Sequence, residues 1–371
     1  MTFHLGLALD GVGWHPAAWR ASSVTEPAEL FGSRYWAGWG RTSAAGGIGF
    51  LTLEDGLTAQ TEQFGAAPGD PGGRVRGRLD PVVTAAVLLS ASDIGEVVVT
   101  RNVTHANPFH TATQLASLAA IGPGRVAWRP QVSANAGDAV VVGGTPTPRL
   151  HPDDIYVPTR IARRLRDLFR DAESHVQTVR DLWTTFPADA LGSGDEFWRP
   201  GRVGPLPGDG PAGPLNVPVS ASPPVVTLAH HALEPYRLAA AAADRVFLTP
   251  TAEHPLPAVL AAFRQIEALT PDATPTAVYA DLAVVLGDTG EHARERLARL
   301  DRAAGAPWTT DTGIFTGSPG ELAEVLTGWR DEHGLAGVRL RPAVLPEDAE
   351  RVIRDVVPLV AGSPPHENIL S

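Results

Sequence analysis

Runs typical of β-strands alternate with runs typical of α-helices along this chain, and that alternation constrains the fold more than any other feature. The segment IGFLTLED at 48–55, for example, precedes DPVVTAAVLLSAS at 80–92, where Asp80 and Pro81 are typical of a helix start. The expected strands are 3–10, 48–55, 95–104, 125–133, 224–229, 244–248, 276–286 and 337–340. The expected helices are 27–46, 80–92, 108–121, 152–183, 235–242, 257–269, 291–304, 319–333 and 346–360.

Strands that alternate with helices pair in parallel through right-handed crossovers. Eight such units in a chain of 371 residues predict an α/β fold, a single (β/α)₈ TIM barrel that spans 1–371. A doubly wound open sheet is the weaker alternative. Two long connections rich in Gly and Pro, 56–78 and 184–223, are expected to be insertion loops. The first follows a strand and belongs to the catalytic face, whereas the second follows a helix and belongs mainly to the opposite face.

Composition excludes several classes of function. The formal net charge of -11 argues against a nucleic-acid partner, which would require a basic face. The chain contains no lysine and no cysteine, which excludes Schiff-base chemistry, the lysine-bearing P-loop, disulfides and thiolate ligands. The first ten residues do not resemble a signal peptide, and no apolar run is long enough to span a membrane. A cytoplasmic protein without a membrane partner is therefore expected.

Two patterns resemble known binding motifs but do not predict a binding site here. The segment GDGPAG at 208–213 matches G-x-G-x-x-G, but it has neither the preceding strand nor the following helix that a dinucleotide-binding turn requires. The histidine pairs His105/His110 and His230/His231 lack a third ligand at a suitable spacing, so no metal site is predicted.

Acidic residues stand where the first two expected strands end. Asp10 ends the first strand, and Glu54 and Asp55 end the second. In a parallel barrel these positions face the active site. Acids at such positions more often cap the next turn or pair with an arginine, and that interpretation is favoured until a further observation supports a catalytic role.

The residues also resemble a known family, the luciferase-like flavin-dependent monooxygenases, in particular the branch with the nitrilotriacetate and dibenzothiophene-sulfone monooxygenases. The resemblance covers nearly the whole chain in the order of the family. Each fragment alone is weak, and the order and spacing give the resemblance its specificity. The matching segments are GWHPAAWR (13–20), GIGFLTLED (47–55), NPFHTATQLASL (107–118), GPGRVAW (122–128), GPLNVP (213–218), LAAAAADRVF (238–247) and GSPGELAEVLTGW (317–329), followed by GVRLRP and PEDAERVIRDVVPLV.

The resemblance implies a (β/α)₈ barrel that binds reduced FMN at the strand ends and uses dioxygen to oxygenate a small, largely apolar organic substrate. It also implies a separate flavin reductase as a partner and a homodimer or homotetramer. The task of such a protein is to hold the flavin ring, exclude water and place the substrate beside the ring.

Cofactor contacts carry over from the family to several strand ends. Glu54 and Asp55 match the end of the second strand, where the family backbone meets the ring. Thr100, Asn102 and Thr104 match the end of the third strand, where small polar side chains bind the ring edge.

Two positions on the fourth strand extend this set. Arg129 stands where the branch usually has asparagine, and Ser133 where it has serine or threonine. An arginine at the ring edge would favour an anionic reduced flavin. Alternatively, Arg129 forms a salt bridge with one of the strand-end acids.

The expected phosphate site departs from the family pattern. The family binds the phosphate with a turn rich in glycine and serine, where this chain has Ala229, His230 and His231. Phe169 stands where the long helix usually presents a tyrosine. Protonated histidines are one replacement for the lost hydroxyl groups. The alternatives are a decayed phosphate site or a different cofactor.

Candidate catalytic residues are His15, Asp55 and Arg129, which are proposed only to handle protons because the flavin carries out the oxygenation. Candidate substrate contacts are Asp10, Trp14, His15 and Trp198, although for Trp198 the favoured interpretation is an anchor of its own loop.

Three functions remain open on this sequence. The first is an FMN-dependent monooxygenase. The second keeps the fold but uses a deazaflavin to transfer hydride without oxygen, because that cofactor has a longer anionic tail. The third is a non-catalytic flavin-binding protein. The losses of hydroxyl groups at Phe169 and His230 motivate the second and third.

Overall fold

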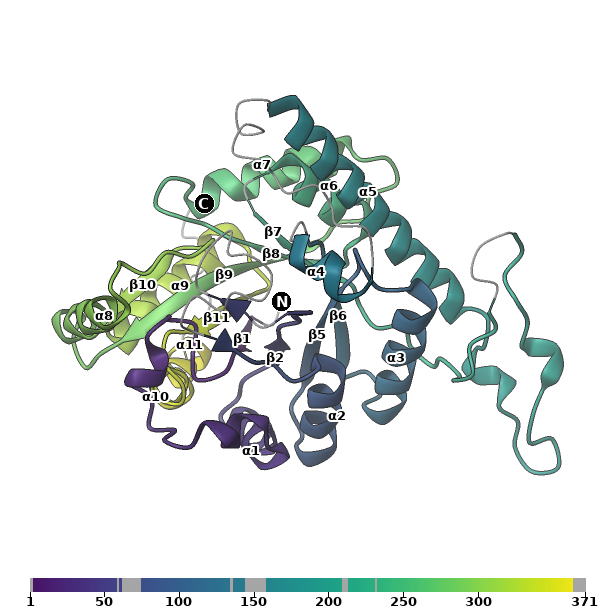
Figure 1. Ribbon diagram of the computed structural model, residues 1–371, viewed down its shortest axis with the longest axis horizontal. Helices are drawn as coiled ribbons and strands as arrows, with labels where there is room; N and C mark the ends of the chain where they lie inside the picture. The colour runs from purple at the N-terminus through teal and green to yellow at the C-terminus, as the bar shows by residue number, and fades with distance from the viewer. Residues whose placement is uncertain are drawn as a thin grey trace, which may run out of the picture.

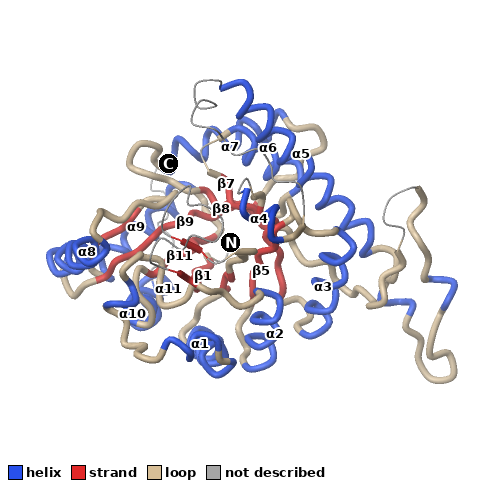
Figure 2. The backbone as a smooth tube through the Cα atoms, viewed as in Figure 1, coloured by secondary structure: helices blue, strands red, loops and turns tan. Residues whose placement is uncertain are grey.

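Parallel strands surround the centre of the molecule and helices surround the strands (Figures 1 and 2). The computed structural model describes residues 3–58, 60–61, 75–133, 136–143, 158–208, 213–230 and 232–362. Its barrel strands are β1 (His4–Leu9), β2 (Phe50–Leu53), β5 (Glu96–Asn102), β6 (Val126–Gln131), β7 (Val226–Ala229), β8 (Arg245–Leu248), β9 (Ala277–Leu286) and β11 (Gly337–Pro342). The other strands are β3 (Gln60–Thr61), β4 (Val75–Arg76) and β10 (Ile314–Gly317).

The α-helices are α1 (Ser33–Ala45), α2 (Pro81–Ala91), α3 (Pro108–Ile121), α4 (Ala136–Val141), α5 (Pro158–Trp183), α6 (Leu233–Ala242), α7 (Leu256–Leu269), α8 (Gly290–Ala304), α9 (Pro319–His333), α10 (Glu347–Arg351) and α11 (Val357–Gly362). Short 3₁₀ turns occur at Ala18–Arg20, Pro27–Phe31, Ala188–Ala190 and Pro200–Arg202. Among the described helices, none has both the length and the apolar character needed to cross a bilayer.

The barrel strands pair in the order β6-β5-β2-β1-β11-β9-β8-β7. The ends of this path, β6 and β7, meet through a parallel bridge between Trp128 and Val225, where the Trp128 N–H donates to the Pro224 carbonyl at 2.8 Å. The predicted (β/α)₈ barrel is therefore confirmed, with a closure between β6 and β7 that is weaker than the other pairings.

Inward-facing residues fill the part of the barrel nearer the amino ends of the strands. Phe50 stacks on Phe247 at a centroid distance of 5.8 Å, and Tyr279 packs against both rings edge-on. Gly6 and Gly337 leave the space for these rings, because a Cβ atom at Gly6 would lie 2.1 Å from Phe50 and one at Gly337 would lie 2.6 Å from Tyr279. This aromatic layer closes the barrel interior on the amino side of the strand ends. A site can therefore form only at the carboxyl ends of the strands, which we call the mouth of the barrel.

Local sequence signals explain where the helices begin and end. The Asp80 carboxylate caps α2 by accepting from the Val82 and Val83 N–H groups, with Pro81 in the first turn as predicted. At α9, Ser318 and Glu321 form a capping box, and Gly334 ends the helix with a left-handed φ of 63°.

The structure corrects the expected elements in four places. The expected helix at 27–46 is broken at Gly32, whose extended backbone separates the turn Pro27–Phe31 from α1. The short strand β10 was not predicted; it pairs with the second half of β9, opposite β11 and beyond the end of β8. The last predicted helix, 346–360, contains a π-helical segment at Val352–Val356. The short helix α4 was also not predicted.

A buried histidine on α5 predicts how stability depends on pH. His175 is 6% exposed, and burial lowers its pKa to about 4. Its Nε2 atom lies 3.2 Å from the Thr111 hydroxyl group. The unfolded chain binds a proton at this imidazole below about pH 6.5, whereas the folded chain does not until about pH 4. Between these values the group lowers the free energy of unfolding by up to about 1.4 kcal/mol for each unit of falling pH.

Urea unfolding of wild-type protein and of His175→Gln at several pH values between 7 and 4 tests this expectation. The variant keeps a polar partner for Thr111 and is expected to lose this part of the acid destabilisation. His254→Gln, at an exposed loop position, is the control and should retain it. Equal pH dependence in wild type and His175→Gln would show that the buried imidazole is not responsible.

Candidate active site

The carboxyl ends of the barrel strands gather most of the predicted polar residues. Asp10 follows β1, Glu54 and Asp55 follow β2, Asn102 ends β5, and Arg129 lies on β6. Alternate residues of each strand face the barrel interior. By that alternation Asp10, Glu54, Asn102 and Arg129 lie in the same inward rows as Gly6, Phe50, Val98 and Ala127, all at the mouth end.

Arg129 is paired with a strand-end acid, as one of the two interpretations of this residue predicted. Its Nη2 donates to Glu54 and its Nε donates to the Thr100 hydroxyl group at 2.9 Å. The other Glu54 oxygen accepts from Nη2 of Arg339 on β11. Glu54 is thus held between two arginines from opposite sides of the barrel.

The ion pairs continue across the barrel from Arg339. Its Nη1 donates to Asp281 Oδ2 at 2.8 Å, and its Nε donates to the Thr52 hydroxyl group at 2.8 Å. Asp281 also accepts from Nε of Arg341 at 2.8 Å, and Arg341 in turn pairs with Asp311. We call the chain of groups Arg129, Glu54, Arg339, Asp281, Arg341 and Asp311 the mouth network.

Burial and neighbouring charges shift the pKa values of several groups in the mouth network. Burial opposes ionisation of Glu54, but Arg129 and Arg339 outweigh it and lower its pKa to about 2. Burial lowers the pKa of Arg129, opposed by Glu54, whereas for Arg341 the two neighbouring aspartates outweigh burial and raise the pKa. Glu54 and Arg341 therefore carry fixed charges at neutral pH.

Asp55 organises the neighbouring strand ends. Its Oδ2 accepts the Asn102 N–H at 2.8 Å, its Oδ1 accepts the Gly56 N–H at 2.8 Å, and Arg101 lies 3.6 Å away. The carboxylate thus ties the end of β2 to the end of β5 and caps the turn that follows, as acids at such positions commonly do.

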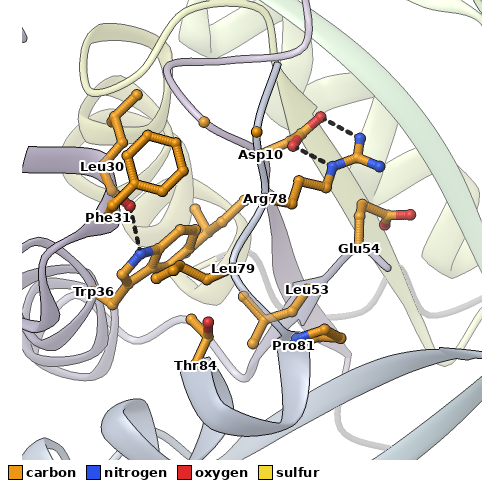
Figure 3. Close-up of a pocket in the computed structure, with 13 residues that line it drawn as sticks. Asp10, Leu30, Phe31, Trp36, Leu53, Glu54, Arg78, Leu79, Pro81 and Thr84 are labelled. Atoms are coloured by element: carbon orange, nitrogen blue, oxygen red, sulfur yellow. Dashed lines mark hydrogen bonds and ion pairs between the residues drawn. The ribbon is translucent and has the colours of Figure 1, made fainter. Parts of the chain in front are cut away.

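Asp10 forms a two-pronged ion pair with Arg78, at the end of the first insertion. The Arg78 Nε donates to Oδ1 at 2.8 Å and Nη2 donates to Oδ2 at 2.7 Å (Figure 3). Nη1 of Arg78 donates to the Asp55 carbonyl at 3.2 Å. The ion pair raises the pKa of Arg78 against the effect of burial. The cavity beside it has a volume of about 20 Å³, which suits a water molecule and not a flavin.

Thr104 and Ser133 join the ends of β5 and β6 to the short helix α4. The Thr104 hydroxyl group accepts the Ser133 N–H at 2.9 Å, and the Ser133 hydroxyl group donates to Asp138 at 2.6 Å. Both predicted residues therefore lie at the mouth, beside the strands that carry Thr100 and Arg129.

Trp14 adjoins the mouth network, whereas His15 does not. The Trp14 ring lies 4.8 Å from the Arg341 guanidinium carbon, and its N–H donates to the Ala8 carbonyl at 2.8 Å. The His15 imidazole is fully buried against α8 instead, with Nε2 3.1 Å from Asp301 and the ring 5.1 Å from Trp308. Its Nδ1 accepts the Ala17 N–H, so Nε2 carries the proton in the neutral ring.

Trp198 lies in a segment that leaves the barrel after α5 and extends to the right in Figures 1 and 2. The ring contacts Phe186 and Phe197 and is largely exposed. This arrangement matches the alternative interpretation, in which Trp198 anchors its own loop.

The expected phosphate turn contains few donors among the described residues. Ala229 ends β7 and is buried, and His230 is 46% exposed, with Nδ1 3.3 Å from Asp311. Burial lowers the pKa of His230, with Asp311 opposing that shift. His231 lies outside the described residues. Phe169 packs against the apolar cluster beneath α5, and the amino end of α6 has no side-chain cap.

The sequence did not single out Arg339, Arg341, Asp281, Asp311 or Arg78. The sequence did contain a pattern that could have identified Arg339, Arg341 and Asp281. Arg339 lies in the expected strand 337–340, Arg341 lies one position past its end, and Asp281 interrupts the apolar strand expected at 276–286. The structure extends the last strand to Pro342 and pairs Arg339 with Asp281. Charged residues in alternate strand positions of a small barrel indicate a polar interior at that level. Asp311 and Arg78 lie in loops, where no such periodicity exists.

The described residues contain no cluster of metal ligands, and the larger surface hollow lies away from the mouth network. Among the described residues, no group of three His, Cys, Asp or Glu side chains is placed to hold a metal ion. A larger surface hollow of about 590 Å³ is lined by Arg180, Pro224, Asp244, Arg245 and neighbouring residues. It lies at the amino end of β8, opposite the mouth network.

Known proteins with similar sequences are monooxygenases. No family model matches the chain. It is 22% identical to the N-acetyl-S-(2-succino)cysteine monooxygenase of Bacillus subtilis (strain 168) over 431 aligned residues, which cover 96% of this chain and 91% of the relative. It is 25% identical to the dibenzothiophene-sulfone monooxygenase of Rhodococcus erythropolis, over 76% of this chain and 61% of that relative.

Solved structures share the fold. The EDTA monooxygenase from Chelativorans sp. BNC1 superposes with a TM-score of 0.77 at 19% identity, covering 98% of this chain and 94% of that one. A riboflavin lyase with modified FMN and riboflavin gives 0.79 at 17% identity, covering 98% and 92%. An F420-dependent secondary alcohol dehydrogenase gives only 0.60 at 12% identity, covering 97% and 99%.

Proposed function

We propose, from the premise that this chain is a monooxygenase of the luciferase-like type, that it uses reduced FMN and dioxygen to oxygenate a small organic molecule. The premise follows from monooxygenase relatives that align over most of the chain and from the shared barrel. The observation that carries the cofactor is the set of hydrogen-bond donors at the ends of β5 and β6 that have no partner among the described residues.

These open donors suit the polar edge of a flavin ring. Within the described residues, Nη1 of Arg129 and Nδ2 of Asn102 donate no hydrogen bond. Thr100 and Glu54 fix the rest of the Arg129 guanidinium group, and the His105 N–H donates to Oδ1 of Asn102. Arg101 Nε and His105 Nε2, also at the end of β5 and just after it, are buried and have no hydrogen-bond partner among the described residues. Buried polar atoms without partners are rare in folded proteins, and at a strand-end mouth they indicate a ligand.

Arg129 gives this edge a positive charge. Glu54 neutralises one side of the guanidinium group, and the open Nη1 remains available to a ligand. When bound, reduced FMN supplies the electrons that activate dioxygen. Arg129 would stabilise the anionic form of the reduced ring, and the aromatic layer of the barrel excludes water from below.

The residues at the expected phosphate turn suit the phosphate of FMN less well than the open donors suit its ring. Ala229 and Phe169 offer no hydroxyl group, and the acidic Asp311 lies beside His230. We infer that a protonated His230, together with the uncapped amino end of α6, would bind the phosphate. The role of His231 is a proposal from the sequence alone.

The remaining roles are also proposals. Asp55 and Arg129 would handle protons at the ring edge, and Trp14 and Asp10 would face the substrate. His15 contacts α8, so its proposed role is to fix the loop that carries Trp14. Dioxygen, a flavin reductase that supplies reduced FMN, assembly as a homodimer or homotetramer, and a cytoplasmic location complete the proposal.

Anaerobic titration tests the proposal directly. The purified chain is expected to bind chemically reduced FMN with a micromolar or lower Kd and, after air is admitted, to consume oxygen faster than free flavin with a substrate present. Absence of binding to any reduced flavin would contradict the proposal.

A parallel titration with the reduced deazaflavin separates the second candidate. The altered turn at Ala229 and His230 is the observation that favours it. Tighter binding of the deazaflavin without oxygen consumption would replace the monooxygenase with a hydride-transfer enzyme. Flavin binding with neither reaction would indicate a non-catalytic flavoprotein.

A further inference from the structure

The buried part of the mouth network carries an excess of positive charge. Arg129, Arg339 and Arg341 are almost fully buried, and the buried carboxylates that face them are Glu54 and Asp281. Three cations therefore oppose two anions. Because burying a charge without a partner is costly, a third anion is needed at the mouth.

Asp311 supplies that anion from an unusual position. It lies on the loop before β10 rather than on a barrel strand, and its side chain is 39% exposed. Nη1 of Arg341 donates to Oδ1, and Nη2 donates to Oδ2 at 3.1 Å, so the pair is bidentate. Nδ1 of His230 lies 3.3 Å from Oδ2 of the same carboxylate. A carboxylate thus sits between a buried arginine and a histidine, open to solvent.

An apolar surface adjoins this carboxylate position. The half-buried Trp14 ring lies 4.8 Å from the Arg341 guanidinium carbon and is fixed by its hydrogen bond to Ala8. A molecule that presents a carboxylate to Arg341 would therefore place its apolar part beside the indole. The open donors of Arg129 and Asn102 belong to β6 and β5, elsewhere around the same mouth.

We propose that Asp311 occupies the place of a substrate carboxylate, and that carboxylate-bearing substrates bind between Arg341 and His230 with their apolar body against Trp14. The proposal deepens the proposed function by naming the substrate class. A ligand carboxylate would supply Arg341 with the same charge as Asp311 does, so the exchange keeps a third anion at the mouth. The planar fork of Arg341 favours a carboxylate, which matches it with two parallel hydrogen bonds.

Calorimetric titration of benzoate into the full, flavin-free chain tests this. Asp311→Asn removes the competing charge, and the affinity for benzoate is expected to rise about tenfold, a change of about 1.4 kcal/mol. Benzamide, which has the same shape without the charge, should show no such gain. Asp189→Asn is the matched control, because Asp189 pairs with Arg202 in the exposed segment after α5. Arg341→Lys keeps the charge but loses the fork, and should weaken benzoate binding in either background.

Several results would overturn the proposal. They are an unchanged affinity in Asp311→Asn, an equal gain for benzamide, no benzoate binding by any variant, or a gain for inorganic phosphate in place of benzoate. The last would assign the position to the flavin phosphate. Because the titrations contain no flavin, they are independent of the FMN experiment. Benzoate binding in a chain that binds no flavin would refute only the proposed function, and the reverse result would refute only this inference.

Discussion

Replacing Asp281 with asparagine is expected to lower the free energy of unfolding by about 3–5 kcal/mol, the usual cost of breaking a buried ion pair by removing one partner. Asp281 is fully buried and accepts hydrogen bonds from both Arg339 and Arg341. Without its charge, two buried guanidinium groups lose their common partner. Chemical denaturation at pH 7 measures the loss.

Asp288→Asn provides the matched control. Asp288 is 72% exposed and pairs with Arg351 at 2.6 Å, so its loss should cost far less than the loss of Asp281. If Asp281→Asn lowers the free energy of unfolding no more than this control does, the mouth network is hydrated in solution. Its excess charge would then not affect the stability of the fold. Pairing Asp281→Asn with Arg339→Gln should recover part of the loss, since it removes one unpaired cation as well.

Replacing Arg129 with glutamine is expected to weaken the binding of reduced FMN by about 10–100-fold, which corresponds to the loss of one hydrogen bond between charged groups. Binding of oxidised FMN should change much less, because its ring is neutral. The variant should stay folded, because Glu54 keeps Arg339 as a partner. Fluorescence or absorbance titration under anaerobic conditions gives both Kd values.

Two further variants make this experiment specific. Arg129→Lys keeps the charge and should retain part of the preference for the reduced ring. Arg202→Gln, in an exposed ion pair on the segment after α5, should leave both affinities unchanged. An equal loss for oxidised and reduced FMN in Arg129→Gln would mean that the arginine shapes the pocket without stabilising an anionic ring.

The sequence indicated the candidate site in part. Strand-end positions selected Asp10, Glu54 and Asp55, the resemblance to the monooxygenase family added Asn102 and Arg129, and the structure brings these residues to one mouth. The same reasoning grouped His15 with Trp14 because they are adjacent in the chain. Their side chains diverge, since Trp14 lies over Arg341 and His15 lies against Asp301. Adjacent residues in a loop do not share a direction unless the backbone conformation is known.

Local patterns in the sequence determined the order and type of the elements. Alternating strand and helix runs, with caps such as Asp80 and Ser318, specify parallel pairing and a barrel, because each signal depends on residues a few positions apart. The partners in the mouth network were decided only by the tertiary structure. Arg339 and Glu54 are 285 residues apart, and their contact depends on how the strands align across the closed barrel. Alternation along a strand shows which charges face inward, but the register between strands decides which of those charges meet.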